Sequence, residues 1–236
     1  MKKLPVELIQ LEQILSPVAK NNYKSIAITA SLPQEGCSTL CLGLAKRTAV
    51  GDKSTLIVDM NLSNPAISNH FKANLKDYSS LQETIEQNVQ STPIPNLFVL
   101  PAPVRSKYLL DLREREKFSQ CLNTWMDKFR YVFIDCSSVI HTDNQIIPAE
   151  NICSVIQGCV LIVLAGRTTE AKVVEAVNKL KSVDANIVGT VLNDQFNQRL
   201  DDELCTATHK FDKYFPNLME KIRHKIKNSA ILTLNV

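Results

Sequence analysis

The stretch Ser31-Leu32-Pro33-Gln34-Glu35-Gly36-Cys37-Ser38-Thr39 lies between an apolar run, Ser25–Ala30, and a run of helical character, Leu40–Val50. A strand, a glycine-bearing turn and a helix in this order surround a phosphate with backbone N–H groups and a positive helix end. We therefore interpret Gly36, Cys37, Ser38 and Thr39 as the nucleotide-binding part of a phosphate loop, with the Ser38 hydroxyl as a candidate ligand of Mg²⁺. The lysine that should reach the β- and γ-phosphates is replaced by Cys37. The sequence thus predicts a site whose ATP chemistry is altered or lost.

The composition is that of a soluble globular protein. The chain has 236 residues, 44% of them hydrophobic and 22% charged, which suits one large α/β domain. A net charge of +3 is too small to indicate nucleic-acid binding. The seven cysteines include no CxxC pair, so we expect free thiols in a reducing compartment, with neither disulfides nor a zinc site. Without a long apolar stretch near the N-terminus or anywhere else, the chain is predicted to be cytoplasmic.

Short β-branched runs alternate with helical stretches along the chain. The runs are apolar throughout, which is typical of strands covered by helices on both faces. The pattern predicts an α/β fold with a mostly parallel sheet. We expect one domain over residues 1–236, with a core at about 20–196 and a helical C-terminal extension at about 197–236. The expected strands are Ser25–Ala30, Thr55–Met60, Leu97–Leu100, Tyr131–Asp135, Cys159–Ala165 and Asn186–Leu192, and the expected helices are Leu4–Val18 (interrupted at Pro17), Thr39–Val50, Leu81–Gln90, Arg113–Phe129 and Thr169–Val183.

Two of the predicted strands end in a carboxylate. Asp59 closes Leu56-Ile57-Val58-Asp59, and Asp135 closes Tyr131-Val132-Phe133-Ile134-Asp135. In open α/β sheets, ligands bind outside the carboxyl ends of the strands, so these groups should lie near the phosphate loop. Mg²⁺ prefers a few protein oxygens together with waters and phosphates. The sequence therefore predicts Ser38, Asp59 and Asp135 as the candidate magnesium residues.

Five segments in order resemble the bacterial tyrosine kinases of capsule and exopolysaccharide export, a branch of the MinD/ParA-like P-loop ATPases. The resemblance covers roughly residues 20–196. Ser31–Thr39 is similar to that family's S-x-x-P-G-E-G-K-S-T, and Asp59–Pro65 to its D-A-D-L-R-x-P. Asn96–Ala102 resembles N-L-x-V-L-P-A-G, and Tyr131–Ser138 resembles Y-V-I-I-D-T-P-P. The fifth resembles L-V-V-x-x-G-x-T ending in G-x-V-L-N, and consists of Leu161–Thr168 together with Gly189–Asn193.

The resemblance implies a P-loop NTPase fold and a site for ATP and Mg²⁺. It implies that Asn193 contacts the adenine and that Asp59 is the catalytic residue if the chain is active. It also implies a membrane-embedded polysaccharide chain-length regulator, or co-polymerase, as partner, which would hold the protein at the inner face of the membrane. A homo- or hetero-oligomer with a related ATPase is a further expectation.

The chain departs from the family pattern at several functional positions. Cys37 replaces the loop lysine, Asn61 replaces the second acidic residue of the middle motif, and Ser63 stands where an arginine is usual. The family's ExxRxxR motif is missing before the first strand. The C-terminal tyrosine cluster is also missing, since Tyr214 is the last tyrosine. We therefore expect a degenerate member, a pseudoenzyme in which ATP binding is weakened.

Three functions remain open at this level. The first is an accessory or regulatory role in exopolysaccharide or capsule biosynthesis without catalysis. The second is an active, autophosphorylating tyrosine kinase in which another basic group, with Arg167 as one candidate, replaces the lysine. The third is a MinD/ParA-like positioning ATPase.

Two further segments have alternative interpretations. Cys37 is either a drifted lysine position or a reactive thiol, because a helix N-terminus lowers the pKa of a thiol. The basic stretch Lys221–Lys227 is predicted to be an amphipathic helix, with Leu218, Met219, Ile222 and Ile226 on one face. Such a helix either packs on the domain or contacts an anionic membrane surface.

Overall fold

The structure is a computed structural model, which describes residues 4–73, 88–103, 106–140, 147–195, 208, 212 and 216–227. The chain divides into two compact units, Met1–Asn193 and Asp194–Val236. Among the described residues, no helix is both long and apolar enough to cross a membrane.

The first unit is built on a seven-stranded sheet in the order β3-β4-β2-β5-β1-β6-β7. All neighbouring strands run parallel except β3 and β4. The mostly parallel sheet is confirmed, and the six expected strands are present with ends shifted by at most one residue. The two-residue β3 was not predicted, since its residues carry no strand pattern of their own. The strands are β1 (Ser25–Ala30), β2 (Thr55–Asp59), β3 (Gln90–Ser91), β4 (Leu97–Leu100), β5 (Tyr131–Asp135), β6 (Gly158–Leu164) and β7 (Ile187–Asn193).

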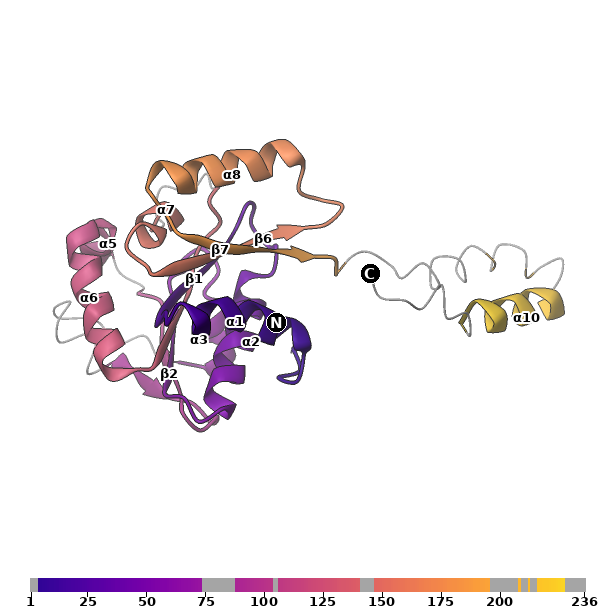
Figure 1. The fold of residues 1–236 in the computed structure, drawn as a ribbon, viewed down its shortest axis with the longest axis horizontal. Coiled ribbons are helices and arrows are strands. Elements are labelled where there is room, and N and C mark those ends of the chain that lie inside the picture. Colours follow the sequence, from indigo (N-terminus) through magenta and orange to yellow (C-terminus); the bar gives the residue numbers. More distant parts are fainter. Residues whose placement is uncertain are drawn as a thin grey trace. The chain divides into compact units, whose positions relative to one another are not determined.

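Helices cover both faces of this sheet (Figure 1). One face carries α1 (Ile9–Lys20), α2 (Cys37–Val50) and α3 (Ala66–Phe71). The other face carries α5 (Ser106–Arg113), α6 (Arg115–Lys128), α7 (Ala149–Cys153) and α8 (Glu170–Ser182). This three-layer arrangement leaves the carboxyl ends of the parallel strands free to build a site.

Three helix predictions need correction. The helix expected over Leu81–Gln90 lies mostly outside the described residues, and its last residue, Gln90, belongs to β3. The helix expected over Arg113–Phe129 is split at Glu114, whose extended backbone separates α5 from α6. Pro17 does not interrupt α1, which continues to Lys20. A proline removes only one backbone hydrogen bond of the helix. The helix continues because Leu11 before Pro17 and Val18 after it are both buried in the core.

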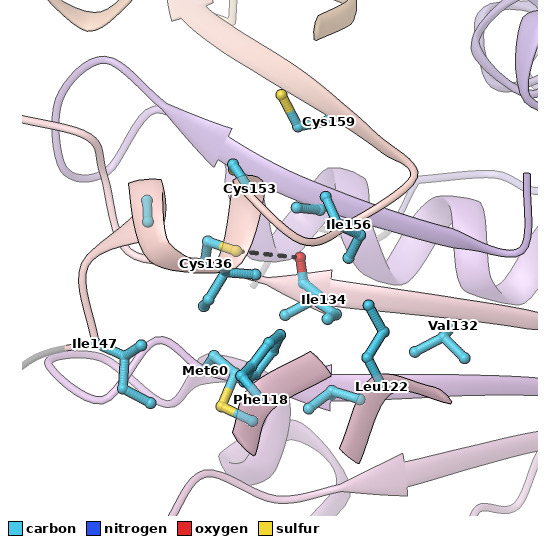
Figure 2. Packing of buried hydrophobic residues seen from close by; sticks show 14 of the residues in the cluster. Met60, Phe118, Leu122, Val132, Ile134, Cys136, Ile147, Cys153, Ile156 and Cys159 are labelled. Carbon is cyan, nitrogen blue, oxygen red and sulfur yellow. Dashed lines mark hydrogen bonds between the residues drawn. The ribbon is translucent and has the colours of Figure 1, made fainter. Parts of the chain in front are cut away.

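The central strands are buried on both faces. Ile26 and Ile28 of β1 belong to the core beside α1 and α2, whereas Ala27 between them belongs to the opposite core. Successive side chains of a strand point to opposite faces, so burial of both faces requires an unbroken apolar run. Figure 2 shows the core on the side of α6 and α7, where Phe118 and Leu122 pack near Val132 and Ile134.

The described cysteines are part of this apolar core. The six within the described part of the chain are free thiols, and all six are buried. Cys136, Cys153 and Cys159 lie near one another in the core on the side of α7 (Figure 2). The expectation of free thiols is therefore confirmed for these residues, and Cys205 lies outside the described residues.

The second unit contains α10 (Pro216–Lys227), the amphipathic helix expected from the sequence. The guanidinium of Arg223 donates to Asp212 Oδ1 at 2.7 Å and to the Thr208 hydroxyl at 3.2 Å. Met219, Ile222 and Ile226 are half-buried, whereas Lys221 and Lys225 are exposed. The helix thus separates an apolar face from a basic one.

Candidate functional site

The phosphate loop joins β1 to α2, as the sequence predicts. Gln34 and Gly36 adopt left-handed backbone conformations, with φ of 66° and 105°. Gly36 is the residue before α2, so Cys37, Ser38 and Thr39 form the first turn of that helix. A Cβ atom at Gly36 would lie 2.8 Å from Asn193 Nδ2. Glycine is therefore required here both by the backbone angle and by the close approach of β7.

Two residues far away in sequence hold the loop in place. The Asn193 side chain donates from Nδ2 to the backbone carbonyl of Glu35 at 2.8 Å. The hydroxyl of Thr168, in the turn after β6, donates to Glu35 Oε1. The Glu35 side chain is completely buried. The family resemblance implied that Asn193 contacts the adenine. In this structure its side-chain amide binds the loop backbone at Glu35.

Glu35 and Thr168 were not proposed as site residues. Both stand within the quoted family-like segments, and this was the only available signal for them. A carboxylate in a turn between proline and glycine is normally solvated, so its burial could not be anticipated from the loop itself.

The two strand-end carboxylates lie side by side. Asp59 and Asp135 occupy paired positions on β2 and β5, and both are completely buried. The sheet thus brings together the two groups predicted from separate parts of the sequence. Their hydrogen bonding, however, differs sharply.

Asp59 is held by the segment that follows it. Its Oδ2 accepts from the Ser68 backbone N–H at 2.9 Å and from the Ser68 hydroxyl at 2.7 Å, and its Oδ1 accepts from the Asn61 N–H at 3.2 Å. The Ser68 hydroxyl oxygen in turn accepts from the Ala102 N–H at 3.0 Å. Burial raises the pKa of Asp59, and the hydrogen bonds from Ser68 and Asn61 oppose that rise. Asp59 thus fastens α3 to the end of β2, and Ser68 links both to the segment that follows β4.

Ser68→Ala is expected to lower the free energy of unfolding by about 1–3 kcal/mol, because it leaves the buried Ala102 N–H without an acceptor and removes one donor to Asp59. Urea unfolding monitored by circular dichroism measures this difference. Ser182→Ala is the control, since the Ser182 hydroxyl makes an exposed hydrogen bond to Lys179. A loss no greater than that of the control would contradict the role assigned to Ser68.

Asp135 has no comparable support. Neither carboxylate oxygen makes a hydrogen bond of ordinary geometry with a described residue, although the Ser38 hydroxyl lies close enough to act on the carboxylate. Burial raises the pKa of Asp135 well above its ordinary value, the charge of Asp59 raises it further, and the nearby Ser38 hydroxyl opposes the rise. Among the described residues, no basic side chain is one of the groups that shift this pKa. Arg167, the in-chain candidate for replacing the lysine, is exposed.

Cys37, in the first turn of α2, lies within range of the charge of Asp135. Its exposed fraction is 8%. Burial raises the pKa of the Cys37 thiol well above its ordinary value, and the charges of Asp135 and Glu35 raise it further. The reactive-thiol interpretation of Cys37 is therefore not supported, because burial and two carboxylates outweigh the helix N-terminus. A lysine at position 37 would have a buried carboxylate beside it.

Several buried oxygen atoms at this edge of the sheet have no hydrogen-bond partner in the part of the chain that the structure describes. Besides both oxygens of Asp135, they include Ser31 Oγ, Glu35 Oε2 and Ser137 Oγ. The segments that carry Ser31 and Ser137 are joined by backbone bonds, Val139 N–H to Ala30 at 2.8 Å and Ile140 N–H to Ser31 at 3.1 Å. Native proteins satisfy nearly all buried polar groups, so such a concentration is typical of a ligand site.

The donor set fits a magnesium ion better than a protein-enclosed metal. Within the described ranges, no group of three or more His, Cys, Asp or Glu side chains could hold a metal ion. Mg²⁺ needs only one or two carboxylates and keeps several waters. Asp135 together with the Ser38 hydroxyl meets that requirement, whereas the oxygens of Asp59 are already engaged by Ser68 and Asn61. The carboxylate that remains available to a metal is Asp135.

No profile of a known protein family matches the chain. Individual proteins with similar sequences are nevertheless found. One relative is CapB of Staphylococcus aureus, which is named as a tyrosine-protein kinase. Its sequence is 25% identical to this chain over 181 residues, which cover 74% of this chain and 77% of CapB. The tyrosine-protein kinase CpsD of Streptococcus agalactiae is 27% identical over 175 residues, covering 72% of this chain and 75% of CpsD.

Solved structures agree on the fold. The chimerical protein CapA2B2 superposes with a TM-score of 0.65 and 24% identity, over 78% of this chain and 83% of that one. The cell division ATPase MinD of Pyrococcus furiosus superposes with a TM-score of 0.58 and 20% identity, over 72% of this chain and 71% of that one. The chain is a relative of the bacterial tyrosine-protein kinases and has the fold of the MinD-like P-loop ATPases.

Proposed function

We propose that the protein is a degenerate, non-catalytic member of the capsule-associated tyrosine kinase group, acting as an accessory or regulatory component of capsule or exopolysaccharide biosynthesis and export. One observation carries this proposal: the position of the loop lysine holds a buried neutral thiol, and the adjacent Asp135 has no cationic partner among the described residues. Phosphoryl transfer depends on positive charge placed around the transferring group. A loop with a carboxylate and no lysine works against that requirement.

The parts of the structure that match the P-loop fold favour a binding role. The strands, the loop and the strand-end carboxylates are all present although the lysine is absent. A chain that has the kinase-like fold but not the positive charge of the loop lysine is better suited to binding partners through its surface than to catalysis. We propose a membrane-embedded polysaccharide chain-length regulator as that partner, which places the protein at the cytoplasmic face of the membrane.

Co-purification tests the partner. The tagged full chain is recovered from detergent extracts of cells, and the chain-length regulator is identified in the eluate by mass spectrometry. We expect equal recovery with the native chain and with Asp135→Asn, because a scaffold does not need turnover. Reproducible absence of the regulator would refute the proposed partner.

Phosphotransfer tests the loss of catalysis. The purified chain is incubated with radiolabelled ATP and Mg²⁺, with Asp59→Ala beside it, and we expect no labelling above background in either sample. Labelling of the native chain that disappears in Asp59→Ala would show an active kinase and overturn the non-catalytic assignment. Equal labelling of both samples would point to a contaminating kinase.

A further inference from the structure

We propose that the outer edge of β7 binds an extended segment of a partner protein, apolar in its middle and basic at its ends, which joins the sheet as a further strand. The inference goes beyond the proposed function, which names a partner but no surface of this chain. Three features of the structure support it: the form of this sheet edge, the apolar surfaces on its two faces, and the charges at its two ends.

The strand β7 lacks the features that usually protect a sheet edge. It is the last strand in the sheet order (orange in Figure 1), and no strand in the described part of the chain pairs with its outer side. Its seven residues, Ile187–Asn193, include neither a proline nor a charged side chain. The opposite edge differs, because β3 has only two residues and is soon followed by Pro93 and Pro95. Proteins commonly shorten, charge or interrupt their edge strands to prevent pairing, so the edge at β7 is suited to accept a strand.

The backbone groups that face outward from β7 can be identified. The Asn193 carbonyl accepts from the Ala165 N–H at 2.8 Å, so it points towards β6. The strand is regular from Gly189 onwards, beyond a register shift near its start. Along a regular strand, residues point alternately towards one neighbour and away from it. The N–H and C=O groups of Thr190 and Leu192 therefore point away from β6, where an added strand would bind them.

A groove lies beside this edge on the side of α1. Its volume is about 330 Å³, and no charged side chain lines it. Ile14 and Pro17 of α1 form part of its lining, together with Val160 of β6 and Val191 of β7. Since every second side chain of a strand points to the same face, alternate side chains of an added strand would lie over this groove. Such pockets are how strand addition selects its partner, and this one selects large apolar side chains.

The other face of the edge is also apolar. Val191 belongs to the core beside α1 and α2, so the next residue, Leu192, points to the opposite face. The exposed fraction of Leu192 is 67%. An added strand would cover this side chain with the residues that alternate with those over the groove. The middle of the partner segment should therefore be apolar on both faces.

The ends of the edge are acidic. Asp184 lies three residues before β7, and Asp194 follows it directly. Both side chains are exposed. A segment with basic residues on either side of its apolar middle would be attracted at both ends.

A second copy of β7 fits this edge less well. In full antiparallel pairing of two copies, Asn186 of one lies opposite Asp194 of the other, so Asp184 and Asp194 approach each other diagonally at both ends. Like charges at such positions are destabilising. The second copy would also place Gly189 and Val191 over the groove, and these residues are too small to fill about 330 Å³. A separate basic segment is therefore the better occupant.

The probe is a short synthetic peptide labelled with fluorescein, whose middle alternates leucine and valine and whose ends carry lysines. Main-chain hydrogen bonds supply the affinity in strand addition, so an unoptimised peptide suffices. Fluorescence anisotropy follows its binding to the full chain without nucleotide. We expect saturable binding that weakens with added salt. Hydrogen exchange measured by NMR should show slower exchange of the Thr190 and Leu192 amides when the peptide is bound.

One variant and its matched control locate the binding. Thr190→Pro removes an outward N–H group and no hydrogen bond to β6, and proline is tolerated at such positions of edge strands. We expect it to weaken peptide binding roughly tenfold, because one hydrogen bond to the added strand is lost. Thr190→Val keeps the backbone N–H and should bind like the native chain. Circular dichroism checks that both variants are folded.

Several results would overturn the inference. Undiminished binding to a folded Thr190→Pro, or equal binding of a peptide N-methylated at its central amides, would show that the backbone edge is not used. No binding of the lysine-ended peptide, or equal binding of a glutamate-ended one, would refute the stated chemistry of the partner. Self-association of the native chain that Thr190→Pro abolishes, seen in sedimentation velocity, would identify a second copy as the occupant instead. The peptide assay contains no chain-length regulator, so its failure leaves the co-purification result unaffected.

Discussion

Asp135→Asn is expected to make the metal-free protein more stable at neutral pH, although it removes a strand-end carboxylate of the site. The native side chain is completely buried, has no hydrogen-bond donor among the described residues and lies beside Asp59. Replacing it with a side chain that cannot ionise should raise the free energy of unfolding by on the order of 2 kcal/mol, the scale of a buried group without partners. For a chain of this size, that corresponds to a rise of about 4–8 °C in melting temperature.

The sign of the pH dependence follows from the raised pKa of Asp135. Below about pH 4, the carboxyl group is protonated in the unfolded chain as well as in the folded one, and its burial then costs little. As the pH rises above that value, the unfolded chain releases the proton while the folded protein retains it. The native protein therefore loses stability with rising pH relative to Asp135→Asn, until the folded-state pKa is reached.

The measurement is the melting temperature of both proteins in EDTA from pH 4 to pH 8. We expect a difference near zero at the acid end that grows and then levels off. Asp127→Asn controls for the change in net charge, since Asp127 is exposed. A variant that is less stable than the native chain at pH 7, or a difference that is the same at every pH, would show that Asp135 is satisfied in the folded protein.

Cys37→Lys is expected to strengthen the binding of Mg²⁺·ATP by roughly ten- to a hundredfold, the equivalent of one charge-assisted hydrogen bond of about 1.5–3 kcal/mol. The loop backbone, Gly36 and the first turn of α2 already have the required arrangement. The missing element is a cation that reaches the phosphates and offsets Asp135.

Calorimetric titration of the purified native chain, Cys37→Lys and Cys37→Met separates charge from side-chain length. Methionine lengthens the side chain without adding charge, so Cys37→Met should bind no better than the native protein. If the native chain binds in the micromolar range, its pocket is functional without the lysine and the nucleotide-dependent functions gain support. If Cys37→Lys does not exceed Cys37→Met, other substitutions have closed the site.

Much of the fold could be predicted from local pattern. Apolar runs such as Val132–Ile134 become strands because every side chain in them must be buried on one face or the other. The phosphate loop was recognisable because strand, glycine turn and helix are consecutive in the chain. The strand-end positions of Asp59 and Asp135 followed from the same reasoning, since parallel strands share a carboxyl edge.

Other features depend on tertiary contacts with residues that are distant in the sequence. Pro17 was expected to interrupt a helix that packing keeps continuous. The pair Gln90–Ser91 is a strand only because β4 provides an antiparallel edge for it. Local propensity is a weak guide wherever tertiary contacts supply the larger energy.

By itself, the sequence determined the α/β architecture, the loop without its lysine and the two carboxylates at the strand ends, because each is encoded by consecutive residues. Only the tertiary structure decided how the carboxylates differ: Ser68 engages Asp59, whereas Asp135 is left without a donor among the described residues. It also decided that Thr168 and Asn193 fasten the loop at Glu35, across 133 and 158 positions of sequence. The physical reason is that a hydrogen bond requires two groups to meet in space, and which groups meet is set by the packing of the whole sheet.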